Sequence, residues 1–145
     1  MAARTWLITG VSSGFGHELT QQLLERGDRV VGTVRDTSKV ADVAEKHPDT
    51  FLVEMLEVTD TRAVRQLVDQ CFERLGRIDV IVSNAGYGLF GAAEEFTDEQ
   101  VDHILATNLT GSIQLIRSAL PHLPRPGRRT RHPNLLLRRP SRLPR

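Results

Sequence analysis

A glycine-rich turn near the start of the chain constrains the fold more than any other stretch. Thr9-Gly10-Val11-Ser12-Ser13-Gly14-Phe15-Gly16 follows the apolar run Trp6-Leu7-Ile8 and precedes an amphipathic segment from Glu18 to Arg26. A strand, a glycine-rich turn and a helix in this order are typical of a site for a dinucleotide pyrophosphate, because backbone N–H groups at the helix start face the anion. Gly10 permits a tight turn, and Gly14 and Gly16 allow the backbone to approach phosphate and strand closely. The glycines alone would also fit an ordinary strand-to-helix turn.

Further apolar segments alternate between strand and helix patterns up to about residue 123. The patterns predict strands at 6–9, 29–34, 51–56 and 79–82, and helices at 18–26, 38–46, about 60–75 and from Thr97 to before Pro121. Thr59 or Asp60 would cap the third helix, and Thr97 with Gln100 forms a capping box for the last. This alternation predicts right-handed βαβ crossovers. We therefore expect an α/β protein, a Rossmann-type doubly wound parallel sheet of strand order 3-2-1-4, truncated after the fifth helix of such a fold.

Charge divides the chain into two unlike parts. Residues 1–124 contain all 18 acidic residues and 11 of the 19 basic ones, whereas residues 125–145 contain eight arginines and no acidic residue. We predict a dinucleotide-binding domain over residues 1–123, as the glycine-rich turn indicates, and an irregular Arg- and Pro-rich tail over residues 124–145. An arginine-rich tail can bind nucleic acid. This alternative is weakened by the absence of aromatic residues and of any recognisable nucleic-acid motif in the tail.

Other features favour a cytoplasmic protein without a metal. The apolar runs are far shorter than the ~20 residues of a membrane span, and the three-residue apolar run after Arg4 is too short for a signal peptide. Cys71 is the only cysteine, which fits a reducing compartment. Its place in a helical apolar stripe predicts a buried thiol. The five histidines lack the spacing of metal ligands, so we expect no metal site.

Four stretches, taken in order, resemble those of the short-chain dehydrogenase/reductase family, in the subgroup of hydroxysteroid and retinol dehydrogenases. Three of them are the glycine turn, Glu57-Val58-Thr59-Asp60 and Ser83-Asn84-Ala85-Gly86, and the fourth is the end of the second strand. The resemblance covers residue 4 to about 123. It implies an NAD(P)-dependent oxidoreductase acting on hydroxyl or carbonyl substrates. Glu57 and Val58 would lie by the adenine, although relatives usually carry Asp in place of Glu57, and Asn84, Ala85 and Gly86 would lie by the ribose.

The end of the second predicted strand bears on the choice of cofactor. NAD-specific relatives have an acidic residue there, which binds the ribose 2′-OH. Here the position is Val34, followed by Arg35, whose guanidinium can pair with a 2′-phosphate. The resemblance therefore implies NADP. Asp36, one residue later, keeps NAD possible, and a solvated Arg35 without a ligand is a further alternative.

Asn108 is the one residue to which the resemblance assigns a catalytic role. It lies within the predicted long helix, where asparagine is an unfavourable interior residue. In the family this Asn binds a water that completes a proton relay to the catalytic lysine, and intact relatives form homo-oligomers partly through this helix. An exposed polar residue without a role is the alternative. We expect Tyr87 at the mouth of the substrate cleft.

The residues that carry out the family's hydride-transfer chemistry are missing from the chain. Tyr87 is the only tyrosine, and the only lysines, Lys39 and Lys46, precede it, so no Tyr-x-x-x-Lys pair exists. With one permitted set of codons, Thr130–Arg145 read one base later becomes Arg-Val-Ile-Gln-Ile-Ser-Ser-Ser-Val-Gly-Gln-Val-Ala-Tyr-Pro-Gly, which resembles the family's fifth strand. We therefore expect a frameshift and a catalytically incomplete chain.

A non-catalytic dinucleotide-binding fragment is the alternative interpretation. In either case the fourth strand would lack a good partner, because arginines and prolines flank Leu135-Leu136-Leu137. We expect an exposed apolar sheet edge there and a poorly soluble product.

Overall fold

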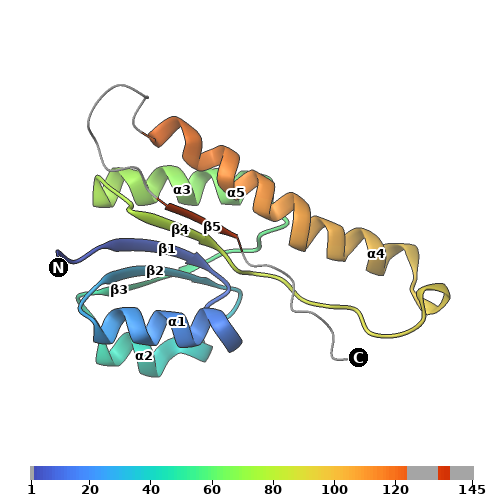
Figure 1. Ribbon diagram of the computed structural model, residues 1–145, viewed down its shortest axis with the longest axis horizontal. Helices are drawn as coiled ribbons and strands as arrows, with labels where there is room; N and C mark the ends of the chain where they lie inside the picture. Colours follow the sequence, from blue (N-terminus) through green and yellow to red (C-terminus); the bar gives the residue numbers. More distant parts are fainter. Residues whose placement is uncertain (1, 124–133, 138–145) are drawn as a thin grey trace.

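A parallel β-sheet lies at the centre of the molecule and carries helices on both faces (Figure 1). The computed structural model describes residues 2–123 and the backbone of residues 134–137. The strands are β1 (Thr5–Thr9), β2 (Arg29–Val34), β3 (Phe51–Met55), β4 (Val80–Ser83) and β5 (Asn134–Leu137). Their order is β3-β2-β1-β4-β5. The predicted Rossmann-type sheet with the order 3-2-1-4 is therefore confirmed.

Helices cover the sheet from both sides. Below it in Figure 1 lie α1 (Gly14–Glu25) and α2 (Ala41–Lys46), the latter preceded by the short 3-10 helix η1 (Thr37–Val40). Above it lie α3 (Thr61–Leu75) and α5 (Gly111–Ala119), and α4 (Asp98–Leu105) extends beyond the sheet. The remaining short helices are η2 (Ala93–Glu95) and η4 (Leu120–His122).

Two hydrophobic cores, one on each face of the sheet, hold these layers together. Successive side chains of a strand point to opposite faces. Trp6 and Ile8 accordingly pack with Leu23 and Leu24 of α1, whereas Leu7 between them packs with α3 and α5. Cys71 is buried in this second core, as predicted. Burial on both faces explains why the central strands are almost continuously apolar.

The long helix predicted from Thr97 is interrupted by one irregular turn. Thr97 and Gln100 form the predicted capping box, with Gln100 N–H donating to Thr97 Oγ1 at 3.3 Å and Thr97 N–H donating to Gln100 Oε1 at 2.9 Å. Between α4 and α5 the backbone forms a π-helical turn, η3 (Ala106–Thr110), which contains Asn108. Only part of the expected apolar stripe is buried. Leu115 is 2% exposed, whereas Leu105 and Leu109 are 50% and 55% exposed.

The expectation of an exposed edge at β4 is wrong. β5 pairs with β4 in parallel, with Val80 opposite Asn134 and Ser83 opposite Leu137. The physical reason is that β4 presents unpaired N–H and C=O groups, which an extended apolar segment such as 135–137 can satisfy despite its flanking arginines and prolines. Residues 124–133 and 138–145 lie outside the described residues, and so does the proposed nucleic-acid-binding part of the tail.

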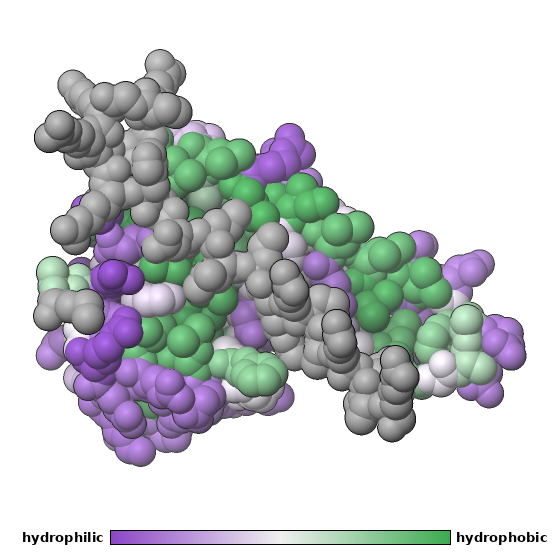
Figure 2. All heavy atoms as spheres, in the orientation of Figure 1, coloured by the Kyte–Doolittle hydropathy of each residue, from purple (hydrophilic) through white to green (hydrophobic). Residues whose placement is uncertain are grey.

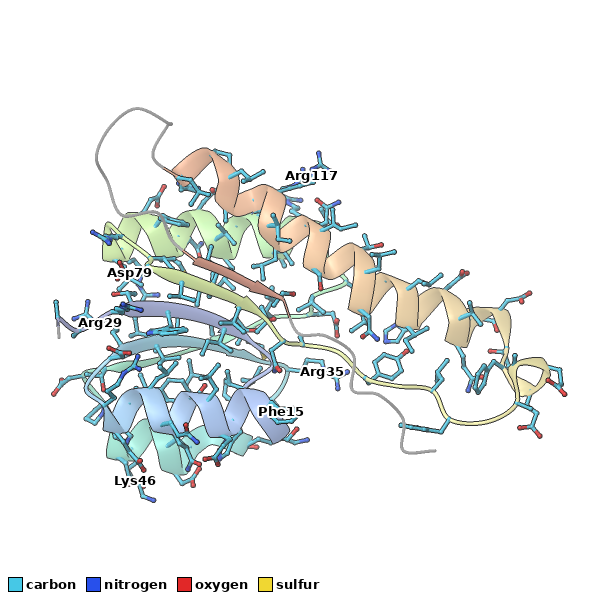
Figure 3. All side chains as sticks on the ribbon, viewed as in Figure 1. Phe15, Arg29, Arg35, Lys46, Asp79 and Arg117 are labelled. Carbon is cyan, nitrogen blue, oxygen red and sulfur yellow. The ribbon has the colours of Figure 1, made fainter. Side chains whose placement is uncertain are left out.

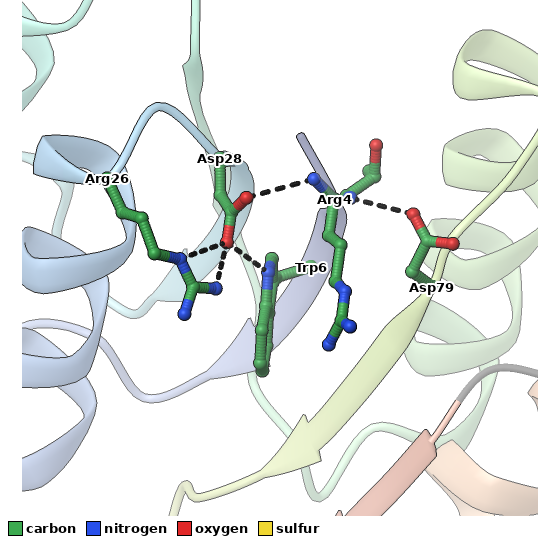
Figure 4. A network of polar contacts seen from close by, with 6 residues as sticks. Arg4, Trp6, Arg26, Asp28 and Asp79 are labelled. Atoms are coloured by element: carbon green, nitrogen blue, oxygen red, sulfur yellow. Dashed lines mark hydrogen bonds and ion pairs between the residues drawn. The ribbon is translucent and has the colours of Figure 1, made fainter. Parts of the chain in front are cut away.

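The amino-terminal edge of the sheet is closed by two carboxylates (Figure 4). Asp28 accepts hydrogen bonds from Arg4 N–H at 2.9 Å, from Trp6 Nε1–H at 3.0 Å and from the Arg26 guanidinium. Asp79 accepts from Thr5 N–H at 3.0 Å and forms an ion pair with Arg77. Burial alone would raise the pKa of Asp28, but the bonds from Arg4, Arg26 and Trp6 outweigh it and hold this pKa below its ordinary value.

Candidate functional site

A cavity of about 1100 Å³ opens at the carboxyl ends of β1, β2 and β4. Ligands of open α/β sheets bind at this edge. Figure 3 shows Arg35 and Phe15 at this end of the sheet and Arg29 and Asp79 at the other. The cavity is lined by Gly10, Ser12, Ser13, Gly14, Phe15, Glu18, Thr33, Val34, Arg35, Leu56, Glu57, Val58, Asn84, Ala85, Gly86, Tyr87, His103 and Thr107.

Two glycines of the turn have different structural roles. Gly14 has a φ of +59°, which favours glycine, and a methyl group there would meet no atom within 4 Å. The space beside Gly14 is therefore open for a ligand. A methyl group on Gly16 would instead overlap the Gly10 carbonyl and the Asn84 side-chain amide. Gly16 is required for close packing of the turn against Asn84.

The start of α1 is suited to an anion. Its N-cap residue, Ser13, makes no side-chain hydrogen bond to the helix, and the first turn contains no acidic residue. The first N–H groups of a helix have no acceptor within the helix and carry partial positive charge. Because Ser12, Ser13 and Gly14 also line the cavity, a phosphate group could bind there without displacing a hydrogen bond from the Ser13 side chain.

Asn84 joins the glycine turn to the end of β4. Its Nδ2 donates to Thr9 O at 3.1 Å and to Gly10 O at 2.8 Å. Its backbone N–H and that of Ala85 both donate to Thr9 Oγ1 at 3.1 Å. The Asn84 residue is 8% exposed, and its two bonds to Thr9 are buried. Two stretches that are 74 residues apart in sequence thereby form one wall of the cavity.

Charged side chains surround the end of the cavity next to β2. Arg35 is the only Lys or Arg among the described residues that line it, and Glu18 and Glu57 are acidic. Glu57 Oε1 accepts from Thr59 N–H at 3.2 Å, and Glu18 Oε1 accepts from Gln22 Nε2 at 2.7 Å. Both carboxylates thus have local partners, and Arg35 supplies the positive charge for a bound anion.

Asn108 lies behind the opposite end of the cavity and does not line it. Its Oδ1 accepts from Tyr87 N–H at 3.1 Å, and its Nδ2 donates to Tyr87 O at 2.7 Å. Its backbone carbonyl accepts from Ser112 Oγ at 3.0 Å. The Tyr87 ring in turn lies 5.7 Å from the His103 ring. Asn108 therefore fixes the loop after β4, and its catalytic role stays a prediction.

Most of the residues predicted to contact the cofactor line this one cavity. The exceptions are Thr9 and Gly16, which support its wall by hydrogen bonding and packing. Val34, which the sequence places at the ribose, also lines the cavity, and five lining residues were not predicted: Glu18, Thr33, Leu56, His103 and Thr107. Thr33 and Leu56 could have been found because each stands at the end of an apolar run, close to Arg35 or Glu57. His103 and Thr107 are four residues apart and so share one face of the long helix.

Two kinds of feature are absent from the described part of the chain. Residues 2–123 contain no group of three or more His, Cys, Asp or Glu that could hold a metal ion. Among the helices described, none is long and apolar enough to cross a membrane.

The sequence matches the family model described as short chain dehydrogenase over residues 4–130. It is 40% identical over 119 residues to a 3-ketodihydrosphingosine reductase from Bacteroides thetaiotaomicron. It is 36% identical over 131 residues to retinol dehydrogenase 8 from Homo sapiens. These similarities cover 81% and 86% of the chain and 41% of each relative.

Solved structures are similar over the same part. A short-chain dehydrogenase from Streptomyces avermitilis has a TM-score of 0.80 at 36% identity, covering 83% of this chain and 44% of that one. An NADPH-bound carbonyl reductase from chicken fatty liver has a TM-score of 0.76 at 26% identity, covering 84% of this chain and 49% of that one. The chain therefore spans less than half the length of these proteins.

Proposed function

The chain belongs to the short-chain dehydrogenase family, and from this premise we propose that it binds NADP in the cavity at the carboxyl ends of β1, β2 and β4. The observation that carries the proposal is the cavity itself, which brings Ser12, Ser13 and Gly14 at the start of α1 together with Arg35, the only lining Lys or Arg of the described residues. With the Tyr-x-x-x-Lys pair present, a protein built on this domain would act in the oxidation or reduction of a small hydroxyl or carbonyl substrate.

The lining residues suit the successive parts of a dinucleotide. Ser12, Ser13 and Gly14 would hold the pyrophosphate at the start of α1. Arg35 would pair with the 2′-phosphate. Glu57 and Val58 would lie by the adenine, and Asn84, Ala85 and Gly86 by the ribose of the nicotinamide half. In an intact relative the bound cofactor would supply hydride transfer at its nicotinamide ring.

We propose that the 145-residue chain binds the cofactor without turning it over. It contains no Tyr-x-x-x-Lys pair to move the proton. Asn108 uses its side chain to hold Tyr87, which keeps the loop after β4 in place. A frameshift near residue 130 would account for the missing pair. The nucleotide sequence tests this, because a shifted frame should encode Tyr-x-x-x-Lys within about 40 codons; without it, a non-catalytic dinucleotide-binding fragment remains.

Binding of NADPH and NADH to the purified chain tests the cofactor assignment. Reduced nicotinamide fluorescence should increase on binding, without any turnover. Arg35→Ala should weaken NADPH about tenfold, the loss of one charge-assisted hydrogen bond, and leave NADH within about twofold. Arg29→Ala is the matched control, because Arg29 is an exposed arginine at the other end of β2. No binding of either nucleotide would refute the proposal.

We further propose self-association through the long helix, as an intact homo-oligomer would require. Val101, Leu105, Leu109 and Ile113 recur every four residues and are 40–55% exposed. Figure 2 shows apolar side chains along this helix and hydrophilic ones over α1 and α2. An apolar surface of this kind marks an interface. Sedimentation should detect oligomers that Leu109→Asp reduces to monomers; a monomeric wild-type chain would refute this part.

The protein would act in the cytoplasm, because a reducing compartment suits a chain whose only cysteine is Cys71. Fractionation of the source cells tests this location. Recovery of the chain outside the cytoplasmic fraction would refute it.

A further inference from the structure

Asp36 places a negative charge directly after Arg35, at the end of β2. A carboxylate facing the ribose would favour the 2′-OH of NAD and repel the 2′-phosphate of NADP. If both faced the ribose, the two neighbouring side chains would therefore have opposite effects on cofactor choice. The hydrogen bonds that each side chain makes within the protein determine which of the two faces the cofactor.

Asp36 is held in a separate role. It is the N-cap residue of η1, and its Oδ1 accepts from Ser38 Oγ at 2.7 Å and from Ser38 N–H at 3.0 Å. Arg35 lines the cavity, whereas Asp36 does not. The bond from the Ser38 hydroxyl, followed by that from its backbone N–H, lowers the pKa of Asp36, so the charge is retained while the carboxylate is turned to the helix.

We propose that Ser38 is a positioning residue for cofactor choice, because its two hydrogen bonds keep the Asp36 carboxylate at the start of η1 and away from the bound 2′-phosphate. This inference rests on the proposed binding of NADP. Ser38 itself does not line the cavity and need not touch the cofactor. Its effect on affinity passes through the position of the Asp36 carboxylate.

The Ser38 hydroxyl makes the shorter of the two bonds to Asp36. Without it, one backbone N–H remains to hold an exposed carboxylate. The Asp36 side chain then populates other rotamers, including those closer to the Arg35 guanidinium. A carboxylate there neutralises part of the charge that attracts the phosphate and repels the phosphate directly.

The test compares two adenosine nucleotides that differ only at the 2′ position. Affinities of 2′,5′-ADP and 5′-AMP are measured by calorimetry for the wild-type chain, Ser38→Ala, Asp36→Asn and the double variant. Ser38→Ala should lower the ratio of the two affinities about threefold, because an additional negative charge approaches the 2′-phosphate. Asp36→Asn should leave it within about 1.5-fold, because the amide oxygen still caps η1. The double variant should return to the wild-type ratio.

Two controls separate this effect from others. Thr37→Ala changes the neighbouring residue in η1 without removing a bond to Asp36, and its ratio should equal that of the wild type. Recovery of the ratio in the double variant shows that the Asp36 charge is responsible, because local unfolding of η1 would not be reversed by Asp36→Asn.

Three results would overturn the inference. An unchanged ratio in Ser38→Ala would show that the hydroxyl does not position Asp36. A several-fold higher ratio in Asp36→Asn alone would show that the carboxylate already faces the phosphate. Failure of the double variant to recover would assign the effect to folding. Arg35→Ala identifies a failure of the underlying proposal: it must lose the 2′-phosphate preference, and a wild-type chain that binds neither nucleotide removes both proposals.

Discussion

The two ends of the sheet require opposite kinds of hydrogen-bonding side chain. At the amino ends of the strands the backbone presents N–H groups, and Asp28 and Asp79 accept from those of Arg4 and Thr5. At the carboxyl ends it presents carbonyl groups, and the amide of Asn84 donates to those of Thr9 and Gly10. Strand polarity thus determines which polar side chains each end requires.

The ends also differ in how completely their hydrogen-bonding groups are used. Asp28 is 3% exposed and accepts from the backbone, an indole and a guanidinium. At the other end the Ser13 side chain makes no bond to α1, and the space beside Gly14 is open. One end therefore serves mainly stability, and the other combines stabilising bonds with space for a ligand. Three measurements test this contrast and a fourth probes the core between the two ends, in order of decreasing effect.

Gly16→Ala should have the largest effect on folding. The added methyl group overlaps the Gly10 carbonyl and the Asn84 amide, so backbone must move, at a cost of about 3 kcal/mol. Gly14→Ala is the matched control. It should cost only about 1 kcal/mol, for its positive φ, since open space surrounds it. Equal losses in urea denaturation would show that the turn is not packed against Asn84.

Asn84→Asp exchanges a donor for an acceptor at the end that presents carbonyl groups. The carboxylate would face Thr9 O and Gly10 O, so unfolding free energy should fall by about 2 kcal/mol. Affinity for NADPH should fall as well, because the same bonds form the cavity wall. Stability unchanged within about 0.5 kcal/mol would show that the carbonyl groups of Thr9 and Gly10 do not require a donor at position 84.

Asp28→Asn makes the converse exchange at the amino end. The amide oxygen can still accept from Arg4 N–H, but the amide nitrogen faces Trp6 and Arg26, so the loss should be about 1 kcal/mol. Because the folded state lowers the pKa of Asp28 from 3.8, wild-type stability should decline as pH falls below that value. The variant should lack this part of the decline, with unchanged affinity for NADPH.

Cys71 should show the smallest response, because it lies in the core away from both ends. Burial raises the pKa of its thiol to about 11. Iodoacetamide at pH 8 should therefore leave the folded chain unmodified over a time in which the urea-unfolded chain reacts fully. Fast alkylation of the folded chain would show that α3 opens readily from the sheet.

The sequence predicts the sheet well because strands are identified by local apolar runs and ordered by the handedness of their connections. The apolar runs around Leu7 and Val31 identify strands, and the crossover rule then orders them. The contacts that define the ends of the sheet are harder to predict from the sequence. The bond from Trp6 to Asp28 joins residues 22 positions apart, and no periodic pattern connects an indole with a carboxylate.

The long helix shows where sequence interpretation fails. Apolar residues spaced four apart predict a helix, but this spacing does not reveal what covers them, and Leu105 and Leu109 are exposed. The same periodicity cannot show a π-helical turn, because one inserted residue shifts the pattern only slightly. β5 was not predicted because the flanking arginines argued against a strand. The unpaired edge of β4 nevertheless favours pairing with an extended segment.

The Thr9 hydroxyl accepts two hydrogen bonds, from the backbone N–H groups of Asn84 and Ala85, both at 3.1 Å. These bonds affect the thermodynamics of ligand binding. They fasten the end of β1 to the loop after β4 before any ligand arrives. A nucleotide entering the cavity therefore has few loop conformations left to restrict. Its association should resemble that of a rigid receptor, with a small entropic penalty from the protein and little change in amide hydrogen exchange at Asn84 and Ala85.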